Sequence, residues 1–468
     1  MTESTIPSTA ITNTLAEFAA SLRYEDIPAE VSERAKQLLL DITGITVRAR
    51  FDVDSTDPMR AALERLQMRG DSVVIGDTLA LSPTAAALLN GAMAHSLDFD
   101  DTHAAGSIHS SAPIVPAALA AAQMADANGK DLIAAIVAGY EIQIRLSLAL
   151  VPKDHYDRGF HPTATCGAFG AAAAAGRAMG LDAATIASAF GLAGSAAAGS
   201  MQFLSDGAWN KRFHVGHAAA NGLMAATLAA EGYQGAGEPI EGKAGFLQAY
   251  APEPQPERAV EALGSRWETL SLAVKPYPTC RYSHAALDGL LALRAEHGID
   301  ADDVTEIEVG LPEMGWKIIG EGDKHHPSTV VDGQFSMPFC AAVALRAGHM
   351  DWDDYAAHLG DEQTLALCRK VSTVVDAQAE AEYPRQMSGV VRVKTTGHSY
   401  EKFVRIPKGE PENFVTTDEL RSKFDALVGP YLPASQADSL ADGLLGLERA
   451  NSVGSLLALS VPPAGTPG

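Results

Sequence analysis

The chain has 468 residues, of which 47% are hydrophobic and 20% charged, so we expect a globular protein of two or three domains and exclude a disordered or fibrous one. Its 58 acidic residues outnumber its 35 basic residues, and the net charge of −23 argues against nucleic acid or an anionic membrane surface as the partner. An anionic substrate would need a local positive pocket.

The first residues and the cysteines indicate a cytoplasmic protein. Residues 1–12 contain neither the basic stretch nor the apolar run that directs secretion. Residues 183–205 carry no charge but are mostly Ala, Gly and Ser, which favours tightly packed helices over a membrane span. The four cysteines lie far apart without metal-finger spacing, so reduced thiols are expected at Cys166, Cys280, Cys340 and Cys368.

The first half of the chain is predicted to be almost wholly helical. Apolar residues recur there at the spacing of one helix face, and Pro28 suits a helix start. The density of Ala and Gly after residue 163 favours a central, closely packed helix pair. The predicted helices cover residues 9–23, 28–50, 57–68, 83–97, 114–128, 130–150, 163–179, 183–199, 215–231 and 257–263.

Near residue 265 the pattern changes to strands mixed with helices, which predicts an α+β domain over residues 266–405. Residues 407–413 read as a polar linker, and the helices after it are expected to return to the first domain, which would then comprise residues 1–265 and 406–468. The fold class is therefore expected to be mainly α. The predicted strands cover residues 269–274, 304–311, 389–396 and 400–404, and the predicted helices cover 282–297, 335–346, 417–430 and 435–447.

Six ionisable side chains crowd the polar segment between two predicted helices at residues 90–113: His95, Asp98, Asp100, Asp101, His103 and His109. Three carboxylates within four positions repel one another, so they need water, a cationic partner or raised pKa values. Asp98 and Asp101 are spaced to share one face, with Asp100 pointing elsewhere. The segment could be a solvated helix end capped by Asp, an acid/base site or a metal site.

Two further segments place basic groups near predicted helix starts. His161 directly precedes a proline that can open a helix, a position that lowers an imidazole pKa and can receive an anion, although a capping or core histidine is the alternative. Lys211, Arg212, His214 and His217 lie at the start of another helix. Cations there oppose the helix dipole unless an anion is also present, which favours a functional role.

The loop KPYPTCRYSH at residues 275–284 is stiffened by two prolines. Cys280 and His284 are four residues apart and could act as nucleophile and base. The loop could equally line an anion pocket, with Lys275 and Arg281 nearby. The sequence contains no phosphate-binding glycine loop, no GxSxG and no HExxH, which argues against nucleotide-driven and triad chemistry.

Six ordered blocks across roughly residues 10–450 resemble the MmgE/PrpD family: LLLDITG, HSLDFDDTH…H, KRFHVGHAAANG, KPYPTCRYSHAALDG, STVVDGQFSMPFCAAVAL and PKGEPEN. That family includes 2-methylcitrate dehydratase, cis-aconitate decarboxylase and iminodisuccinate epimerase. The resemblance implies a large all-helical domain built from both chain ends, a smaller α+β lid domain, a site between the two, a homodimer, and no metal or organic cofactor.

By motif position, the resemblance implies a set of catalytic residues comprising Asp98, His109, His161, Lys211 and Lys275. Substrate binding is assigned to Thr102, Arg281, Cys280, His284 and Arg212. His109 or His161 would be the base, the cations would hold substrate carboxylates, and Asp98 would orient a histidine. Structural roles are expected for His95, Asp100 and His103.

Two departures from the family pattern bear on the reaction. Decarboxylase-like members have His where this chain has Cys280 and Tyr where it has Met337, and both differences argue against decarboxylation. The sequence therefore predicts a cofactor-independent lyase that removes a proton α to a carboxylate of a small di- or tricarboxylate. The main predicted reaction is a dehydration of the 2-methylcitrate dehydratase kind. The alternatives are epimerisation of an amino- or imino-dicarboxylate and decarboxylation of the cis-aconitate kind.

Two alternatives belong to other classes of protein. One is a metal-dependent enzyme that uses His95, Asp98, Asp101, His103 and His109 as ligands. The other is a non-enzymatic helical binding protein.

Overall fold

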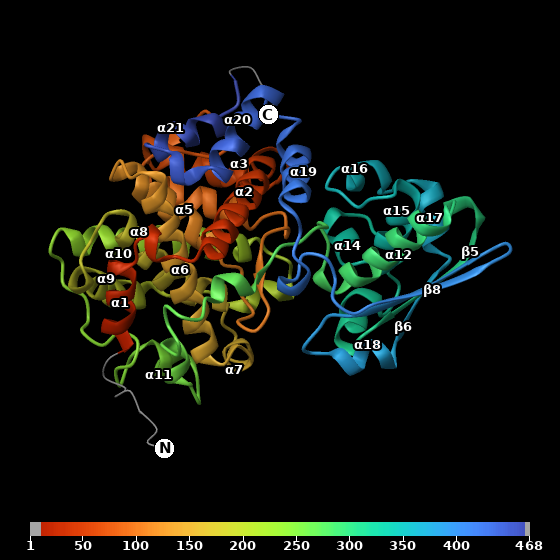
Figure 1. Ribbon diagram of the computed structural model, residues 1–468, viewed down its shortest axis with the longest axis horizontal. Coiled ribbons are helices and arrows are strands. Elements are labelled where there is room, and N and C mark those ends of the chain that lie inside the picture. Colours follow the sequence, from red (N-terminus) through yellow and green to blue (C-terminus); the bar gives the residue numbers. More distant parts are fainter. Residues whose placement is uncertain (1–10, 464–468) are drawn as a thin grey trace. The chain divides into compact units, whose positions relative to one another are not determined.

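The computed structural model describes residues 11–463, which divide into two compact units (Figure 1). The first unit comprises residues 11–273 and 417–463, and the second comprises residues 274–416. Most of the described residues are helical, which confirms the predicted fold class. The helix predicted from residue 9 is observed from Ile11, since residues 1–10, like residues 464–468, lie outside the described part of the chain.

Helix α8 (Pro162–Ala178) lies at the centre of the first unit. It packs against α5 (Ser111–Met124), α6 (Gly129–Leu150), α9 (Ala183–Ala196) and α10 (Asn210–Ala230), and every residue of α8 except Arg177 is buried. A Cβ added at Gly170 would lie 2.7 Å from the Gly139 carbonyl oxygen of α6. The small residues of the predicted central helices therefore allow backbones to approach closely.

Helix α6 is long and apolar enough to cross a membrane, but its most apolar window is wholly buried inside the unit. Within it, the Glu141 carboxylate and the Arg145 guanidinium form a fully buried ion pair at 3.1 Å. Arg145 also donates to the carbonyl oxygens of Glu261 and Arg266, each at 2.6 Å. Packing inside a helical core explains why α6 is apolar. The Glu141–Arg145 pair also binds the loop that contains Glu261 and Arg266 to this helix.

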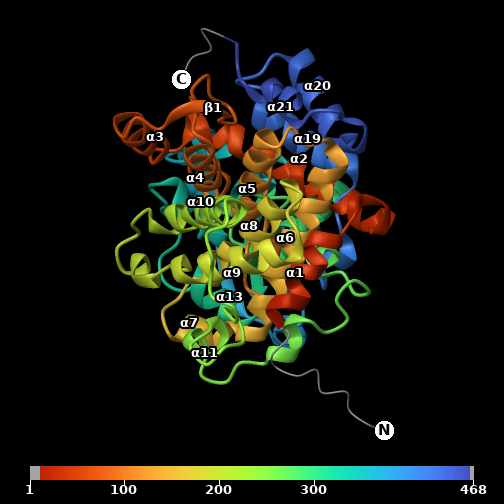
Figure 2. The same cartoon turned by 90° about the vertical axis from the view of Figure 1, so that its left-hand side faces the viewer.

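The first unit joins segments from opposite ends of the chain. Helices α19 (Thr417–Val428) and α20 (Ala434–Leu445) pack against α2 (Ala29–Asp52), as Figure 2 shows. The other named elements of this unit are α1 (Ile11–Ser21), α3 (Thr56–Arg65), β1 (Arg69–Val73), β2 (Ala80–Leu81), α4 (Pro83–Ala94), β3 (Thr102–His103), α7 (Pro152–Asp157), α11 (Phe246–Tyr250), β4 (Leu272–Ala273) and α21 (Val453–Leu457).

The second unit is built on a four-stranded sheet in the order β6-β5-β7-β8. Strand β5 (Val304–Leu311) pairs in parallel with β6 (Val371–Val375) and antiparallel with β7 (Gly389–Thr395), which forms a hairpin with β8 (Ser399–Val404). Helices α12 (His284–His297) and α15 (Met337–Ala347) pack against this sheet. The remaining helices are α13 (Glu313–Gly315), α14 (Val330–Gln334), α16 (Asp354–His358), α17 (Glu362–Cys368) and α18 (Ala377–Glu382).

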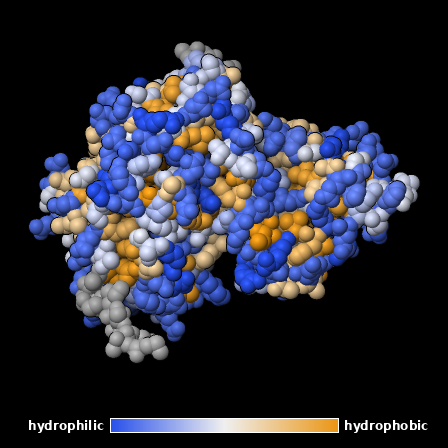
Figure 3. Space-filling model, viewed as in Figure 1, coloured by the Kyte–Doolittle hydropathy of each residue, from blue (hydrophilic) through white to orange (hydrophobic). Residues whose placement is uncertain are grey.

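Several predicted elements are confirmed and others are shorter than predicted. Strand β5 and the β7–β8 hairpin are observed, whereas β6 was not predicted. The strand predicted over residues 269–274 is reduced to β4, which pairs with β3 in the first unit, and the helix predicted over 257–263 is a 3-10 turn at Pro256–Ala259. The face shown in Figure 3 is largely hydrophilic, and the four cysteines are free and buried.

Candidate active site

The segment that carries the six ionisable residues is fixed at both ends by helices. Helix α4 ends at Ala94, so His95 follows it directly, and α5 begins two residues after His109. Between these ends, β3 pairs with β4, with Thr102 opposite Ala273. This pairing and the two helix ends hold the segment in one conformation.

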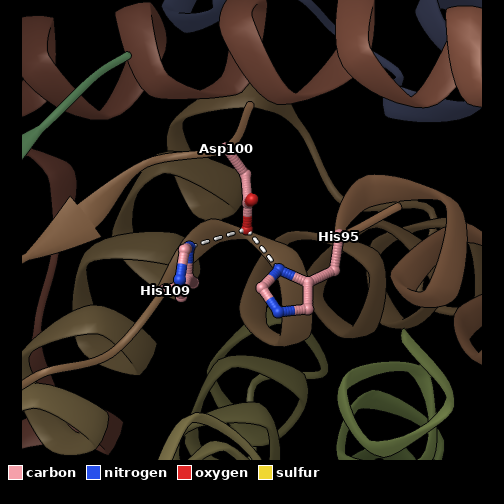
Figure 4. Close-up of side chains that lie close together, drawn as sticks. All are labelled: His95, Asp100 and His109. Atoms are coloured by element: carbon pink, nitrogen blue, oxygen red, sulfur yellow. Dashed lines mark hydrogen bonds and ion pairs between the residues drawn. The ribbon is translucent and has the colours of Figure 1, made fainter. Parts of the chain in front are cut away.

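Asp100 lies between two imidazoles (Figure 4). Its Oδ2 atom lies 2.7 Å from His95 Nδ1 and 3.2 Å from His109 Nδ1. Asp100 and His95 are buried, while the His109 side chain is 17% exposed. Among the described residues, Asp100 Oδ1 and His95 Nε2 have no hydrogen-bond partner. A buried polar atom of this kind can be satisfied by water or by a ligand.

Burial and charge separate the protonation states of these groups. Burial lowers the pKa of His95 to about 4, against the opposing effect of Asp100, and the Lys211 charge lowers it further. Burial alone would raise the pKa of Asp100, but His95 and His109 outweigh it and hold that pKa well below the ordinary value. At neutral pH a charged carboxylate therefore accepts the Nδ1 proton of a neutral His95.

Further imidazoles extend this cluster. The His95 ring centroid lies 4.6 Å from that of His109 and 6.0 Å from that of His161, which in turn lies 5.8 Å from that of His214. His161 precedes the first residue of α8, as predicted, and burial followed by the charges of His95 and Lys211 lowers its pKa well below the ordinary value. Nδ1 of His161 and of His214 also lacks a hydrogen-bond partner in the described part of the chain.

Lys211 and Asp98 form an ion pair beside the imidazoles. Their Nζ and Oδ1 atoms are 2.9 Å apart, and the Lys211 side chain is 34% exposed. Burial lowers the pKa of Lys211, but the Asp98 and Asp100 carboxylates outweigh this effect and raise the pKa above its ordinary value. The anion that the sequence analysis expected near these helix-start cations is Asp98, which forms an ion pair with Lys211.

The backbone of this segment is held by a residue from α19. Lys423 Nζ donates to the Phe99 carbonyl oxygen at 3.1 Å, lies 2.7 Å from Asp41 Oδ1, and lies 3.6 Å from the centroid of the Phe99 ring. Asp98, just before Phe99, has a φ of +52°, a left-handed conformation that few aspartates adopt. Lys423 therefore fixes the turn that directs Asp98 and Asp100 to different partners.

Asp101 and His103 contact the scaffold. Asp101 accepts hydrogen bonds from the amides of Ser110 and Ser111 and so caps α5. His103 Nδ1 accepts the Gly106 amide, and its Nε2 lies 3.5 Å from a Glu268 oxygen. Thr102 is half-buried on β3.

The five-residue metal site that the sequence allowed is therefore not assembled as predicted. Ligand atoms of His95, Asp100 and His109 do lie within 4.8 Å of one another. That smaller set could hold a cation, but its shortest contact is a direct hydrogen bond between His95 and Asp100. Asp100, for which the sequence predicted a structural role, is the centre of the observed group.

Two other basic residues of the α10 start contact neighbouring side chains. Arg212 donates to the Ser55 hydroxyl at 2.8 Å, and burial lowers its pKa. His217 Nδ1 lies 3.0 Å from Asn221 Nδ2, and the His217 ring stacks on the Phe213 ring with centroids 5.3 Å apart. Lys211, in the same turn of α10 as Arg212, instead contacts the Asp98 carboxylate.

The predicted residues of the 275–284 loop belong to the second unit. Lys275 is buried, and Arg281 forms a two-point ion pair with Glu410. His284 is the first residue of α12, whereas Cys280 precedes that helix and donates its amide to the Gln334 carbonyl oxygen at 3.0 Å. Arg281 thus already has a carboxylate partner inside its own unit.

The two departures from the decarboxylase-like pattern share one environment. Cys280 and Met337 both belong to the hydrophobic core of the second unit. Each is buried, and Met337 is fully so. Apolar packing therefore occupies the two positions at which decarboxylase-like members carry a histidine and a tyrosine.

Comparisons with known proteins cover nearly the whole chain. The MmgE/PrpD N-terminal domain matches residues 13–259, and the MmgE/PrpD C-terminal domain matches residues 277–447. The cis-aconitate decarboxylase-like protein oryM of Aspergillus oryzae is 30% identical over 482 aligned residues, which cover 98% of each chain.

Two relatives named cis-aconitate decarboxylase are also similar. The one from Aspergillus terreus is 28% identical, with 98% of this chain and 97% of the relative covered. The human one is 30% identical, with 80% of this chain and 77% of the relative covered. These matches confirm the resemblance seen in the six sequence blocks. The chain belongs to the MmgE/PrpD family.

Proposed function

We propose that this protein is a cofactor-independent lyase that decarboxylates a small unsaturated tricarboxylate of the cis-aconitate kind. The observation that carries the proposal is the Asp100 carboxylate, buried between two imidazoles and close to the Lys211–Asp98 ion pair. The names of the full-length relatives favour decarboxylation over the dehydration that led among the predicted reactions.

Decarboxylation of such a substrate makes three demands on a site. The carbon–carbon bond to one carboxylate breaks, CO₂ leaves, the electron pair forms a new double bond as the old one shifts, and a distant carbon takes up one proton. The site must therefore supply a proton, hold the remaining carboxylates with fixed cations, and exclude water. Proton transfer from a positioned side chain contributes a factor of about 10²–10⁴ in rate.

The first unit contains groups suited to each demand. His109 is the partly exposed imidazole, and its Nδ1 lies 3.2 Å from the Asp100 carboxylate, so we assign proton transfer to His109. The Lys211 ammonium, which stays charged at neutral pH, is assigned to a substrate carboxylate. His95 and His161, both buried and with lowered pKa values, are neutral groups of a largely dry site. Lys275 remains a predicted second cation.

An NMR assay in heavy water with a panel of acids tests this assignment. The panel contains cis-aconitate and citrate-, malate- and aspartate-like acids. The expected result is a five-carbon unsaturated dicarboxylate from cis-aconitate, with one deuterium on carbon per product molecule. Deuterium exchange without net conversion would indicate an epimerase, and no reaction with any acid would contradict the proposal. Activity that disappears on exhaustive chelation and returns with metal would contradict cofactor independence.

Dehydration is the second candidate, because Cys280 and Met337 lie in the apolar core of the second unit. Neither residue can supply the imidazole or phenol found at those positions in decarboxylase-like members. In the same assay, dehydration of a hydroxy-tricarboxylate without release of CO₂ would favour this candidate.

We also propose that the protein is a homodimer that associates through one face of α10. Large apolar side chains recur along this face at helical spacing, and four of them are 39–51% exposed: Trp209, Phe213, Met224 and Leu228. An apolar stripe of this kind on a hydrophilic protein commonly marks an interface. Sedimentation of the Met224→Glu/Leu228→Glu variant should give a monomer where the unchanged protein gives a dimer. A monomeric unchanged protein would contradict this proposal.

A further inference from the structure

A buried histidine, His214, lies in the first unit one helix turn after Lys211. His214 is 8% exposed, and its ring centroid lies 5.8 Å from that of His161 and 5.7 Å from that of Phe203. Residues three positions apart in a helix lie on the same side of it. Since Lys211 contacts Asp98 from this side, the start of α10 presents both an ammonium and an imidazole to the candidate active site.

Three neighbouring imidazoles each have a buried ring nitrogen that lacks a hydrogen-bond partner within residues 11–463. These atoms are Nε2 of His95, Nδ1 of His161 and Nδ1 of His214. The large majority of buried side-chain polar atoms in proteins have a partner. Three such nitrogens on rings that lie next to one another therefore indicate where a polar ligand binds.

Gly199 leaves room beside the His161 and His214 side chains. Its carbonyl oxygen accepts a hydrogen bond from the His161 amide at 2.9 Å. A Cβ added at position 199 would lie 3.3 Å from His161 Cβ and 3.5 Å from His214 Nδ1. A longer side chain at this position would therefore fill the space next to His214 Nδ1, which glycine keeps open.

His161 and His214 are both uncharged at neutral pH. Burial lowers the pKa of His214, and the charge of His217 lowers it further. Burial, followed by the charges of His95 and Lys211, lowers the pKa of His161 well below its ordinary value. A neutral imidazole has one N–H donor, so it can hydrogen-bond to a carboxylate without forming an ion pair.

Donors of this kind suit the carboxylate that leaves in the proposed reaction. That group begins with a negative charge and departs as neutral CO₂, so an ion pair with it would be lost during the reaction and would raise the barrier. The other two carboxylates of the substrate keep their charges throughout. A cation can therefore hold them without this penalty.

We propose that His214 contacts the substrate and, together with His161, donates hydrogen bonds to the departing carboxylate, while Lys211 holds a carboxylate that is retained. This inference rests on the proposed decarboxylation. In that step the bond between the departing carboxylate and its methylene carbon breaks, and the electron pair forms the new double bond. The far carbon of the old double bond takes up the proton from His109, so His214 transfers no proton.

Calorimetric titration with two unreactive acids tests this contact in the full-length protein. Propane-1,2,3-tricarboxylate carries all three carboxylates, whereas in methylsuccinate a methyl group replaces one carboxymethyl arm. The test variant is His214→Phe, which keeps a ring but removes both nitrogens. The matched control is His217→Phe, one turn further along α10, where the histidine contacts Asn221 and Phe213.

His214→Phe should raise the Kd of the tricarboxylate by at least about 10-fold and leave the Kd of methylsuccinate unchanged, because only the first acid has the arm that His214 binds. His217→Phe should change neither Kd. An equal loss for both acids would mean that His214 only shapes the site, and no loss for either would place it outside the site. Both results would overturn the proposal. If circular dichroism shows that His214→Phe is unfolded, His214→Leu gives the same test.

Turnover of cis-aconitate by the unchanged protein is measured in parallel, so that the two proposals can fail separately. Release of CO₂ by the unchanged protein, with an unchanged Kd of the tricarboxylate in His214→Phe, would contradict only the role of His214. No release of CO₂ would contradict the proposed function and the role of His214 with it.

Discussion

Each unit of this protein holds a group of histidines around an aspartate, and the two groups differ in burial. In the first unit, His95 and Asp100 are fully buried and only His109 reaches partial exposure. In the second, the side chains of His349 and Asp351 are 54% and 56% exposed, and only Asp354 is buried. The imidazole–carboxylate distances are nearly the same in the two groups.

The comparison shows that burial, more than the identity of the side chains, decides what such a group can do. Burial lowers the pKa of His95 to about 4, while two imidazoles keep Asp100 charged. This arrangement keeps a neutral imidazole and a charged carboxylate side by side, as acid/base chemistry requires. The exposed group keeps contact with water, which screens its charges.

The largest expected effect is that of Asp100→Asn, which removes the charge between the two imidazoles but keeps the shape of the side chain. We expect turnover to fall by about 10²–10⁴, because a neutral amide removes the charged carboxylate between the two imidazoles, one of which, His109, we assign to proton transfer. Steady-state kinetics measure the loss. Asp323→Asn, which changes an exposed carboxylate next to His325, should retain activity. Unchanged turnover in Asp100→Asn would contradict an acid/base role for the buried group.

The pH dependence of stability should also reveal the buried group. Unfolded His95 takes up a proton near pH 6.5, but folded His95 does so only near pH 4. The unfolded state therefore binds more protons in this window, and the free energy of unfolding falls as the pH drops from 6.5 to 4, by up to about 3 kcal/mol from this residue. Urea unfolding across this range should show a shallower slope for His95→Gln than for the control His398→Gln, on the exposed β7–β8 turn. Equal slopes would contradict the buried, neutral state of His95.

Lys211→Met should mainly weaken substrate binding. Loss of one charge-assisted hydrogen bond, about 1.5–3 kcal/mol, corresponds to a rise in KM of about 10- to 100-fold for a polycarboxylate. Lys211→Arg should recover part of this loss, because the charge is kept. A KM that is unaffected by Lys211→Met would exclude this lysine from the binding site and would favour a non-enzymatic role for its ion pair.

The smallest expected effect is that of His349→Gln. A half-exposed ion pair contributes little, so the free energy of unfolding should change by about 0.5 kcal/mol or less. A loss of unfolding free energy above about 2 kcal/mol would contradict the small contribution expected of an exposed group. Urea unfolding provides the measurement.

Sequence periodicity predicted the long elements of the fold and missed those that depend on distant partners. Apolar residues alternate with polar residues or glycine along most of β5, and α6 repeats apolar residues at helical spacing, so both were predicted close to their observed bounds. Strand β6 has five residues and forms by pairing with β5, which lies about 60 residues earlier. Strands β3 and β4 have two residues each, and no pattern in the sequence around them predicts that they pair.

For the candidate site, the sequence identified the residue types but not which of them contact each other. Asp98, His109, His161 and Lys211 were singled out, yet Asp98 pairs with a lysine 113 positions away while Asp100 faces the histidines. The left-handed turn at Asp98 separates these directions, and no spacing rule predicts it. Lys423 was missed because a lysine on an amphipathic helix reads as a surface residue.

The proposed reaction is tested most directly by following cis-aconitate labelled with ¹³C at each carboxylate, with the unchanged protein and with Asp100→Asn in parallel. The account predicts one labelled CO₂ and one five-carbon unsaturated dicarboxylate per substrate molecule consumed, at a rate at least about 100-fold lower in the variant. Consumption of substrate without CO₂ release, or equal rates in the two proteins, would contradict it.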